Sequence, residues 1–144
     1  GADVVQIFDS WAGLIAPEDL ANFCFIPNLK IIEFCKEHKI PAICFPRGIN
    51  QKYKEFNNIV KPDGLNIDYN IDPVWVKKNL KNVIIQGGLD PKILLSSKHE
   101  IEIKTKIYLD TFKESPYIFN LGHGLLPETD PDKVNELINF YRKY

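Results

Sequence analysis

Five short apolar segments alternate with helix-like segments along the whole 144-residue chain. The strand-like segments are rich in β-branched and other apolar residues, and they fall at residues 4–8, 40–45, 64–68, 82–86 and 117–120. Strands that alternate with helices predict a parallel sheet built from right-handed β-α units. The predicted fold class is therefore α/β, with about five parallel strands.

The loops after these strands narrow the choice of parallel fold. No strand is followed by a Gly-x-Gly-x-x-Gly motif or by a P-loop lysine motif, so the usual signatures of nucleotide-binding folds are absent from the sequence. A (β/α)8 TIM-type barrel is the better match, but a closed barrel needs eight units and about 250 residues. We predict a partial barrel. Because residues 4–8 have the composition of a strand buried on both faces, we also expect further chain before them.

The helical segments carry recognisable start signals. Pro17 with two following acids predicts the first helix, and Pro27 predicts its interruption or restart. The i, i+3, i+4, i+7 spacing then predicts one helix face made of Ile31, Phe34, Cys35 and His38. Residues 50–58 have a polar, helical pattern, and the three later helices are predicted to begin at Asp72–Pro73, at the Ser97/Glu100 capping box and at Asp130–Pro131.

Composition and charge exclude several classes of partner. The chain has 18 basic and 19 acidic residues and a net charge of −1, so it has no global basic field for nucleic acid or anionic lipid. No apolar run reaches the roughly 20 residues of a membrane helix, and the first residues lack a signal-peptide pattern. Cys24, Cys35 and Cys44 have no Cys-x-x-Cys spacing, so we predict reduced, buried thiols, no metal site and a cytoplasmic location.

Polar residues follow the ends of all five predicted strands. They are Asp9 or Ser10, Arg47, Asp68, Asp90 and His123. The carboxyl ends of parallel strands share one rim, where ligands bind in β/α folds, so these residues are candidates for one site. Each also has a structural alternative. Asp68 and Asp90 can cap the helices that follow them, Ser10 can be a turn hydroxyl, and Arg47 can be an exposed loop side chain.

The fifth loop is the most distinctive of these, because His123 lies between Gly122 and Gly124. Glycine on both sides predicts positive φ angles and a sharp corner at the end of the strand. An imidazole at such a position can donate or accept a proton near neutral pH, and Arg47 is the natural partner of an anionic ligand. A solvated loop histidine is the structural alternative.

Several motifs together resemble one family. Phe-Asp-Ser-Trp-Ala-Gly at residues 8–13, Gln-Gly-Gly-Leu-Asp-Pro at 86–91 and Asn-Leu-Gly-His-Gly at 120–124 closely resemble the carboxyl-terminal part of uroporphyrinogen decarboxylase. Phe-Pro-Arg-Gly at 45–48, Ile-Asp-Tyr at 67–69 and Pro-Glu-Thr-Asp-Pro at 127–131 match in the same order. The resemblance covers residues 1–144 and implies that they are the carboxyl-terminal portion of one barrel domain. Gly88 stands where the family more often has asparagine.

The resemblance implies a cytosolic enzyme of haem biosynthesis, usually a homodimer, that works without metal or organic cofactor. The family converts the four acetate side chains of uroporphyrinogen III to methyl groups, giving coproporphyrinogen III. The resemblance implies that Ser10 and His123 contact the substrate. His123 is also the candidate for a catalytic proton transfer, and we add Arg47 as a substrate-binding residue. The family's catalytic aspartate, substrate tyrosine and amino-terminal arginines lie before this chain begins, and Asp9 is not that aspartate. We therefore expect a truncated or proteolytic piece, or half of a split barrel, that does not decarboxylate alone.

Two other interpretations remain open from the sequence. Related barrels transfer methyl groups from corrinoids with a zinc ion, but they carry a His-x-Cys and a late cysteine, and here no cysteine follows Cys44. The other alternative is a catalytically inactive interaction module.

Overall fold

The computed structural model describes residues 1–144, which form one five-stranded parallel sheet in the order of the chain. The strands are β1 (Val5–Asp9), β2 (Ala42–Pro46), β3 (Gly64–Ile67), β4 (Ile84–Gly87) and β5 (Tyr117–Ile118). Each strand pairs in parallel with the next, as in part of a (β/α)8 barrel. The predicted fold class is confirmed. The last strand is shorter than predicted, and beyond it only a Leu89–Leu121 bridge continues the pairing.

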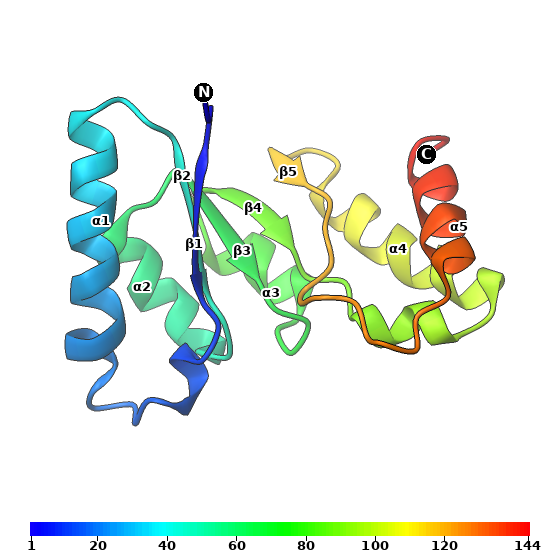
Figure 1. Cartoon of the computed structure of the whole chain (residues 1–144), viewed down its shortest axis with the longest axis horizontal. Coiled ribbons are helices and arrows are strands. Elements are labelled where there is room, and N and C mark those ends of the chain that lie inside the picture. Colours follow the sequence, from blue (N-terminus) through cyan, green and yellow to red (C-terminus); the bar gives the residue numbers. More distant parts are fainter.

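Helices separate successive strands and lie beside the sheet, with α1 and α2 flanking its first strands and α4 and α5 its last (Figure 1). The α-helices are α1 (Ile26–Glu37), α2 (Tyr53–Val60), α3 (Pro73–Asn79), α4 (Lys98–Phe112) and α5 (Pro131–Tyr141). Short turns precede several of them, namely η1 (Ala12–Leu14), η2 (Ala21–Phe25), η3 (Asn50–Lys52) and η4 (Pro91–Leu95).

The predicted helix starts after β3, β4 and β5 are confirmed by their caps. Asp72 and Asp130 each accept a hydrogen bond from the backbone N–H two residues later, at 2.9 Å. Ser97 and Glu100 form the complete capping box of α4. These side chains satisfy backbone donors that have no partner inside the helix.

The first helix differs from the prediction. Residues 17–19 form a turn, and the helix begins after it with the π-helical turn η2; α1 then starts at Ile26 with Pro27 in its first turn. Its buried face contains Ile32 and Cys35, whereas Ile31 is 43% exposed and so lies outside the core. Both faces of α1 carry apolar residues, so periodicity alone did not identify the one that packs on the sheet.

The apolar core lies between the helices and the outer face of the sheet, and includes Leu65, Phe56 and Phe112. The other face of the sheet is exposed at its two ends, because Phe8 is 66% exposed and Ile118 is 43% exposed, whereas their register partners Phe45 and Gln86 are buried. The prediction that residues 4–8 are buried on both faces is therefore wrong for this chain. β1 is an edge strand, and its inner face has no covering layer.

The three cysteines are free and buried. Burial, with smaller contributions from nearby acidic groups, raises the pKa of Cys44 to about 12 and raises that of Cys24 further. Both thiols are therefore protonated at neutral pH, as expected for small core residues. None of the helices combines the length and apolar character needed to cross a membrane.

The difference between the two faces of the sheet can be tested by substitution. Leu65→Ala empties a fully buried site in β3 and is expected to lower the free energy of unfolding by about 2–5 kcal/mol. Phe8→Ser removes a mostly exposed side chain whose edge contact with Phe45 is worth about 1 kcal/mol. Urea unfolding of the isolated chain at low concentration measures both. Equal losses would mean that the inner face of β1 is covered in solution.

Candidate functional site

The loops after β1 and β2 form the first part of the site. Ser10 and Arg47 line one hollow of about 320 Å³, together with Trp11, Gly13, Leu14, Gly48 and Asn70. Arg47 Nη1 donates a long hydrogen bond of 3.5 Å to the backbone oxygen of Ser10. Arg47 Nε is buried without a hydrogen-bond partner, and no carboxylate lines this hollow. Ser10 and Arg47 thus lie in the same hollow, and the positive charge of Arg47 suits an anionic ligand.

Asp9 does not face this hollow. Its carboxylate accepts a hydrogen bond of 3.3 Å from Asn28 Nδ2, so it is directed toward α1. Of the two residues predicted after β1, only Ser10 lines the site.

Asp68 is a buried structural acceptor rather than a lining residue. Its side chain is 0% exposed and accepts hydrogen bonds from Gly48 N at 2.7 Å, Tyr53 Oη at 2.9 Å and Asn70 N at 2.8 Å. Burial, followed by the charge of Asp68, raises the pKa of Tyr53 well above its usual value. Tyr53 therefore stays a hydrogen-bond donor throughout the neutral pH range. Asp68 thus holds the loop of Arg47 through its hydrogen bond with Gly48 instead of capping a helix.

Asp90 caps the helical turn that follows it, which is the structural role given above as the alternative to a place in the site. Its Oδ1 accepts a hydrogen bond of 2.9 Å from Lys92 N at the start of η4. It lines a separate hollow with Lys92 and Lys104, away from Ser10 and Arg47.

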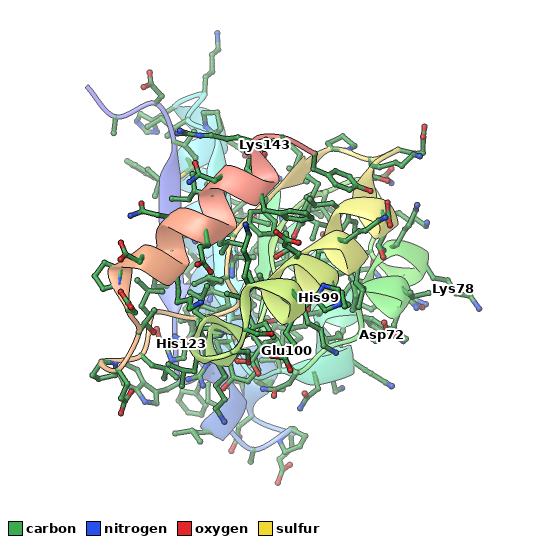
Figure 2. The ribbon with its side chains drawn as sticks, turned by 90° about the vertical axis from the view of Figure 1, so that its right-hand side faces the viewer. Asp72, Lys78, His99, Glu100, His123 and Lys143 are labelled. Carbon is green, nitrogen blue, oxygen red and sulfur yellow. The ribbon has the colours of Figure 1, made fainter.

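His123 is exposed, on the loop that leads from β5 into α5 (Figure 2). It lines a mostly apolar hollow of about 380 Å³ between this loop and α5, which also includes Phe119, Leu137 and Tyr141. Phe119 stacks on Tyr141 with ring centroids 4.8 Å apart, which holds the loop against α5. No carboxylate lines this hollow either.

The glycines beside His123 act differently from the prediction. Positive φ angles occur at Gly48, Gly87 and Gly88, but not at Gly122 or Gly124. A Cβ atom at Gly122 would lie 2.5 Å from the backbone nitrogen of Tyr69. Gly122 is therefore needed for close approach of two backbones, whereas the space around Gly124 is open.

Because the strands are parallel, the loops carrying Ser10, Arg47 and His123 all leave the same edge of the sheet. Within this chain, Ser10 and Arg47 share one hollow and His123 lines another. The predicted residues thus form two parts of one rim, and the loops after β3 and β4 lie between these parts.

Sequence reasoning missed two contributors. Asn70 lines the Ser10–Arg47 hollow, and Tyr53 donates to Asp68 from α2. The Asp-x-Asn spacing after β3 is typical of a turn closed by the aspartate side chain, and it could have indicated Asn70. Nothing local to Tyr53 indicates a partner 15 residues away. No group of three or more His, Cys, Asp or Glu side chains is arranged to hold a metal ion.

Two alanine substitutions beside His123 test the close approach. In Gly122→Ala, the new Cβ meets backbone atoms of Tyr69 and Asp68 at 2.5–2.9 Å, which side-chain movement cannot relieve. We expect a loss of about 1–3 kcal/mol in the free energy of unfolding. Gly124→Ala is the matched control, since its Cβ meets nothing within 4 Å. Denaturant unfolding that gives equal midpoints for the two variants would contradict this packing.

Comparison with known proteins identifies the family. The family model described as "Uroporphyrinogen decarboxylase (URO-D)" matches residues 1–144. The uroporphyrinogen decarboxylase of Rickettsia felis is 42% identical over 146 residues, which cover 100% of this chain and 42% of that relative. Those of Jannaschia sp. and of Wolbachia sp. subsp. Drosophila simulans are each 38% identical, covering 99% and 100% of this chain and 42% and 43% of the relatives. The chain spans less than half the length of these relatives, and it belongs to the uroporphyrinogen decarboxylase family.

Proposed function

We propose that this chain supplies part of the active site for decarboxylation of the four acetate side chains of uroporphyrinogen III to give coproporphyrinogen III. The observation that carries the proposal is the pair of carboxylate-free hollows at one rim, one with Arg47 and Ser10 and the other with His123. A tetrapyrrole that carries many carboxylates needs cationic and hydrogen-bonding groups at more than one place. The rim offers two such places.

The chemistry requires more than these residues. When an acetate carboxyl leaves as carbon dioxide, the electrons of the broken carbon–carbon bond must enter the pyrrole ring, which has to be protonated to accept them. The methylene carbon that is left then takes up a proton while the ring gives one up, so that the acetate becomes a methyl group. The protein's part is to orient the substrate and to hold its remaining carboxylates in fixed positions. In the proposal, Arg47 and Ser10 bind one carboxylate, and His123 binds another or transfers a proton.

The remaining groups are proposed to come from outside this chain. The relatives are more than twice as long as the matched region, and the resemblance assigns the family's catalytic aspartate, tyrosine and arginines to the segment before it. Residues 1–144 are then the carboxyl-terminal portion of a single barrel domain, whose other strands cover the exposed inner face around Phe8 and Ile118. The complete protein is proposed to be a cytoplasmic homodimer that uses no metal or organic cofactor, as the family resemblance implies.

A chimera tests the proposal directly. Residues 1–144 replace the matching region of the Rickettsia felis uroporphyrinogen decarboxylase, and coproporphyrin is measured by fluorescence chromatography after oxidation of the product. We expect the chimera to form coproporphyrinogen and the isolated chain to form none. A folded chimera without activity would contradict the proposal.

Substitution of His123 in the chimera separates function from stability. His123→Gln removes the imidazole from an exposed position, so the thermal midpoint should change by no more than about 2 °C. Loss of a hydrogen bond to a charged group should lower kcat/KM at least about 10-fold. His99→Gln, at an exposed position in α4, is the control and should retain full activity. Normal kcat/KM in His123→Gln would make this histidine structural.

Substitution of Arg47 tests the carboxylate contact. Arg47→Gln removes the only charged side chain that lines its hollow, and we expect KM to rise about 10- to 100-fold. Arg142→Gln is the matched control, because Arg142 is the other arginine of the chain and is exposed beyond α5. The same KM in both variants would exclude Arg47 from substrate binding.

A further inference from the structure

One peptide group joins the loops of Ser10 and Arg47 to the interior of the fold. The carbonyl oxygen of Arg47 accepts a hydrogen bond of 2.8 Å from Gly13 N, and the N–H of the same peptide, that of Gly48, donates to Asp68 Oδ2 at 2.7 Å. The peptide between Arg47 and Gly48 is therefore held at both ends. One end is fixed by the loop that carries Ser10, and the other by a buried carboxylate.

The contact between Gly13 and Gly48 leaves little freedom for these loops to move apart. A Cβ atom at Gly13 would lie 2.7 Å from the carbonyl oxygen of Gly48 and 2.8 Å from its Cα. The two backbones are in direct contact, so a shift of Gly48 must also shift Gly13. Asp68 is thus linked through Gly48 to Gly13, and both glycines line the Ser10–Arg47 hollow.

The loop of His123 rests on the main chain of the same residue. A Cβ atom at Gly122 would lie 2.9 Å from the carbonyl carbon of Asp68 and 3.2 Å from its Cα. Gly122 N also donates to Leu89 O at 2.7 Å, which fixes the loop from the β4 side. Asp68 therefore supports the Arg47 loop through its side chain and the His123 loop through its backbone.

We infer that Asp68 is a positioning residue, which fixes the placement of Arg47 and Ser10 relative to His123 so that both can hold carboxylates of one substrate. This inference rests on the proposed function for its effect on activity, but the positioning itself does not require the reaction. Tyr53 assists from α2, because its hydroxyl donates to Asp68 Oδ2 and accepts from Asp68 N. A small misplacement of groups that orient a substrate lowers turnover strongly.

Asp68→Asn is the primary test, made in the chimera described above. An asparagine amide has one acceptor oxygen in place of two, so one of the backbone N–H groups of Gly48 and Asn70 faces an NH2 donor and loses its hydrogen bond. We expect kcat/KM to fall about 10- to 100-fold, with a decrease in kcat as well as an increase in KM. Asp63→Asn is the matched control. Asp63 also accepts a backbone N–H, that of Ala42 at 2.9 Å, but before β3 at the opposite end of the sheet, so kcat/KM should stay within about twofold.

A double-variant cycle distinguishes positioning from general destabilisation. If Asp68 acts through Arg47, Asp68→Asn should add little to the effect of Arg47→Gln, whereas Asp63→Asn should add its own small effect independently. Fully additive effects of Asp68→Asn with both Arg47→Gln and Ser10→Ala would overturn the inference. If Asp68→Asn does not fold, Tyr53→Phe replaces it in the same cycle, with an expected fall of about 3- to 10-fold and the same lack of additivity. Additive effects of Tyr53→Phe in this cycle would contradict the inference in the same way.

Amide measurements on the isolated chain keep this inference separate from the proposed function. Asp68→Asn should accelerate hydrogen exchange at Gly48 or at Asn70, whichever N–H loses its acceptor, and shift the amide resonances of Gly13 and Gly122, while Asp63→Asn should affect Ala42 instead. Unchanged resonances at Gly13 and Gly122 would overturn the positioning role even if the chimera is active. An inactive parent chimera together with the expected amide changes would reject the proposed function and leave the positioning role intact.

Discussion

The parallel pairing of the five strands in chain order is the constraint on which the rest of this structure depends. Each strand runs in the same direction as its neighbour, so every loop that follows a strand emerges at one edge. Ser10 and His123 are more than 100 residues apart in the chain and Arg47 lies between them, and the strand directions alone bring all three to the same rim. Had one strand been antiparallel, its polar residue would lie at the far end of the sheet.

Backbone contacts at glycine then bring the loops close together. Gly13 packs on Gly48, and Gly122 packs on the backbone of Asp68, at distances where a Cβ atom does not fit. Such contacts allow adjacent loops to support one another without long side chains filling the rim. Between them, the buried carboxylate of Asp68 gives the N–H of Gly48 an acceptor within the protein.

Much of the fold could be predicted from the sequence because its signals are local. The caps at Asp72 and Asp130 and the capping box at Ser97 each act within a few residues, and all are found as predicted. The inner face of β1 and the buried face of α1 depend on what packs against them, which local periodicity does not contain. Residues 4–8 have the composition of a buried strand, yet Phe8 is exposed because no layer of this chain covers it.

The site was predictable in type but not in arrangement. A polar residue after each strand identified the rim, yet the same pattern fits Asp90, whose side chain caps η4, and Asp68, whose side chain supports a loop. The role of Gly122 was wrongly assigned to its φ angle, because a close approach to Tyr69 involves a segment more than 50 residues earlier in the chain. Contacts between residues so far apart in the chain depend on how the loops pack against one another, and local sequence patterns do not contain that information.

In the proposed function, two carboxylate-binding places on one rim hold a single tetrapyrrole. A crystal structure of the chimera with coproporphyrinogen III, prepared without oxygen, tests it most directly. We expect one ligand carboxylate within hydrogen-bonding distance of Arg47 or Ser10 and another carboxylate of the same molecule within hydrogen-bonding distance of His123. A ligand bound elsewhere, with both hollows empty, would contradict it.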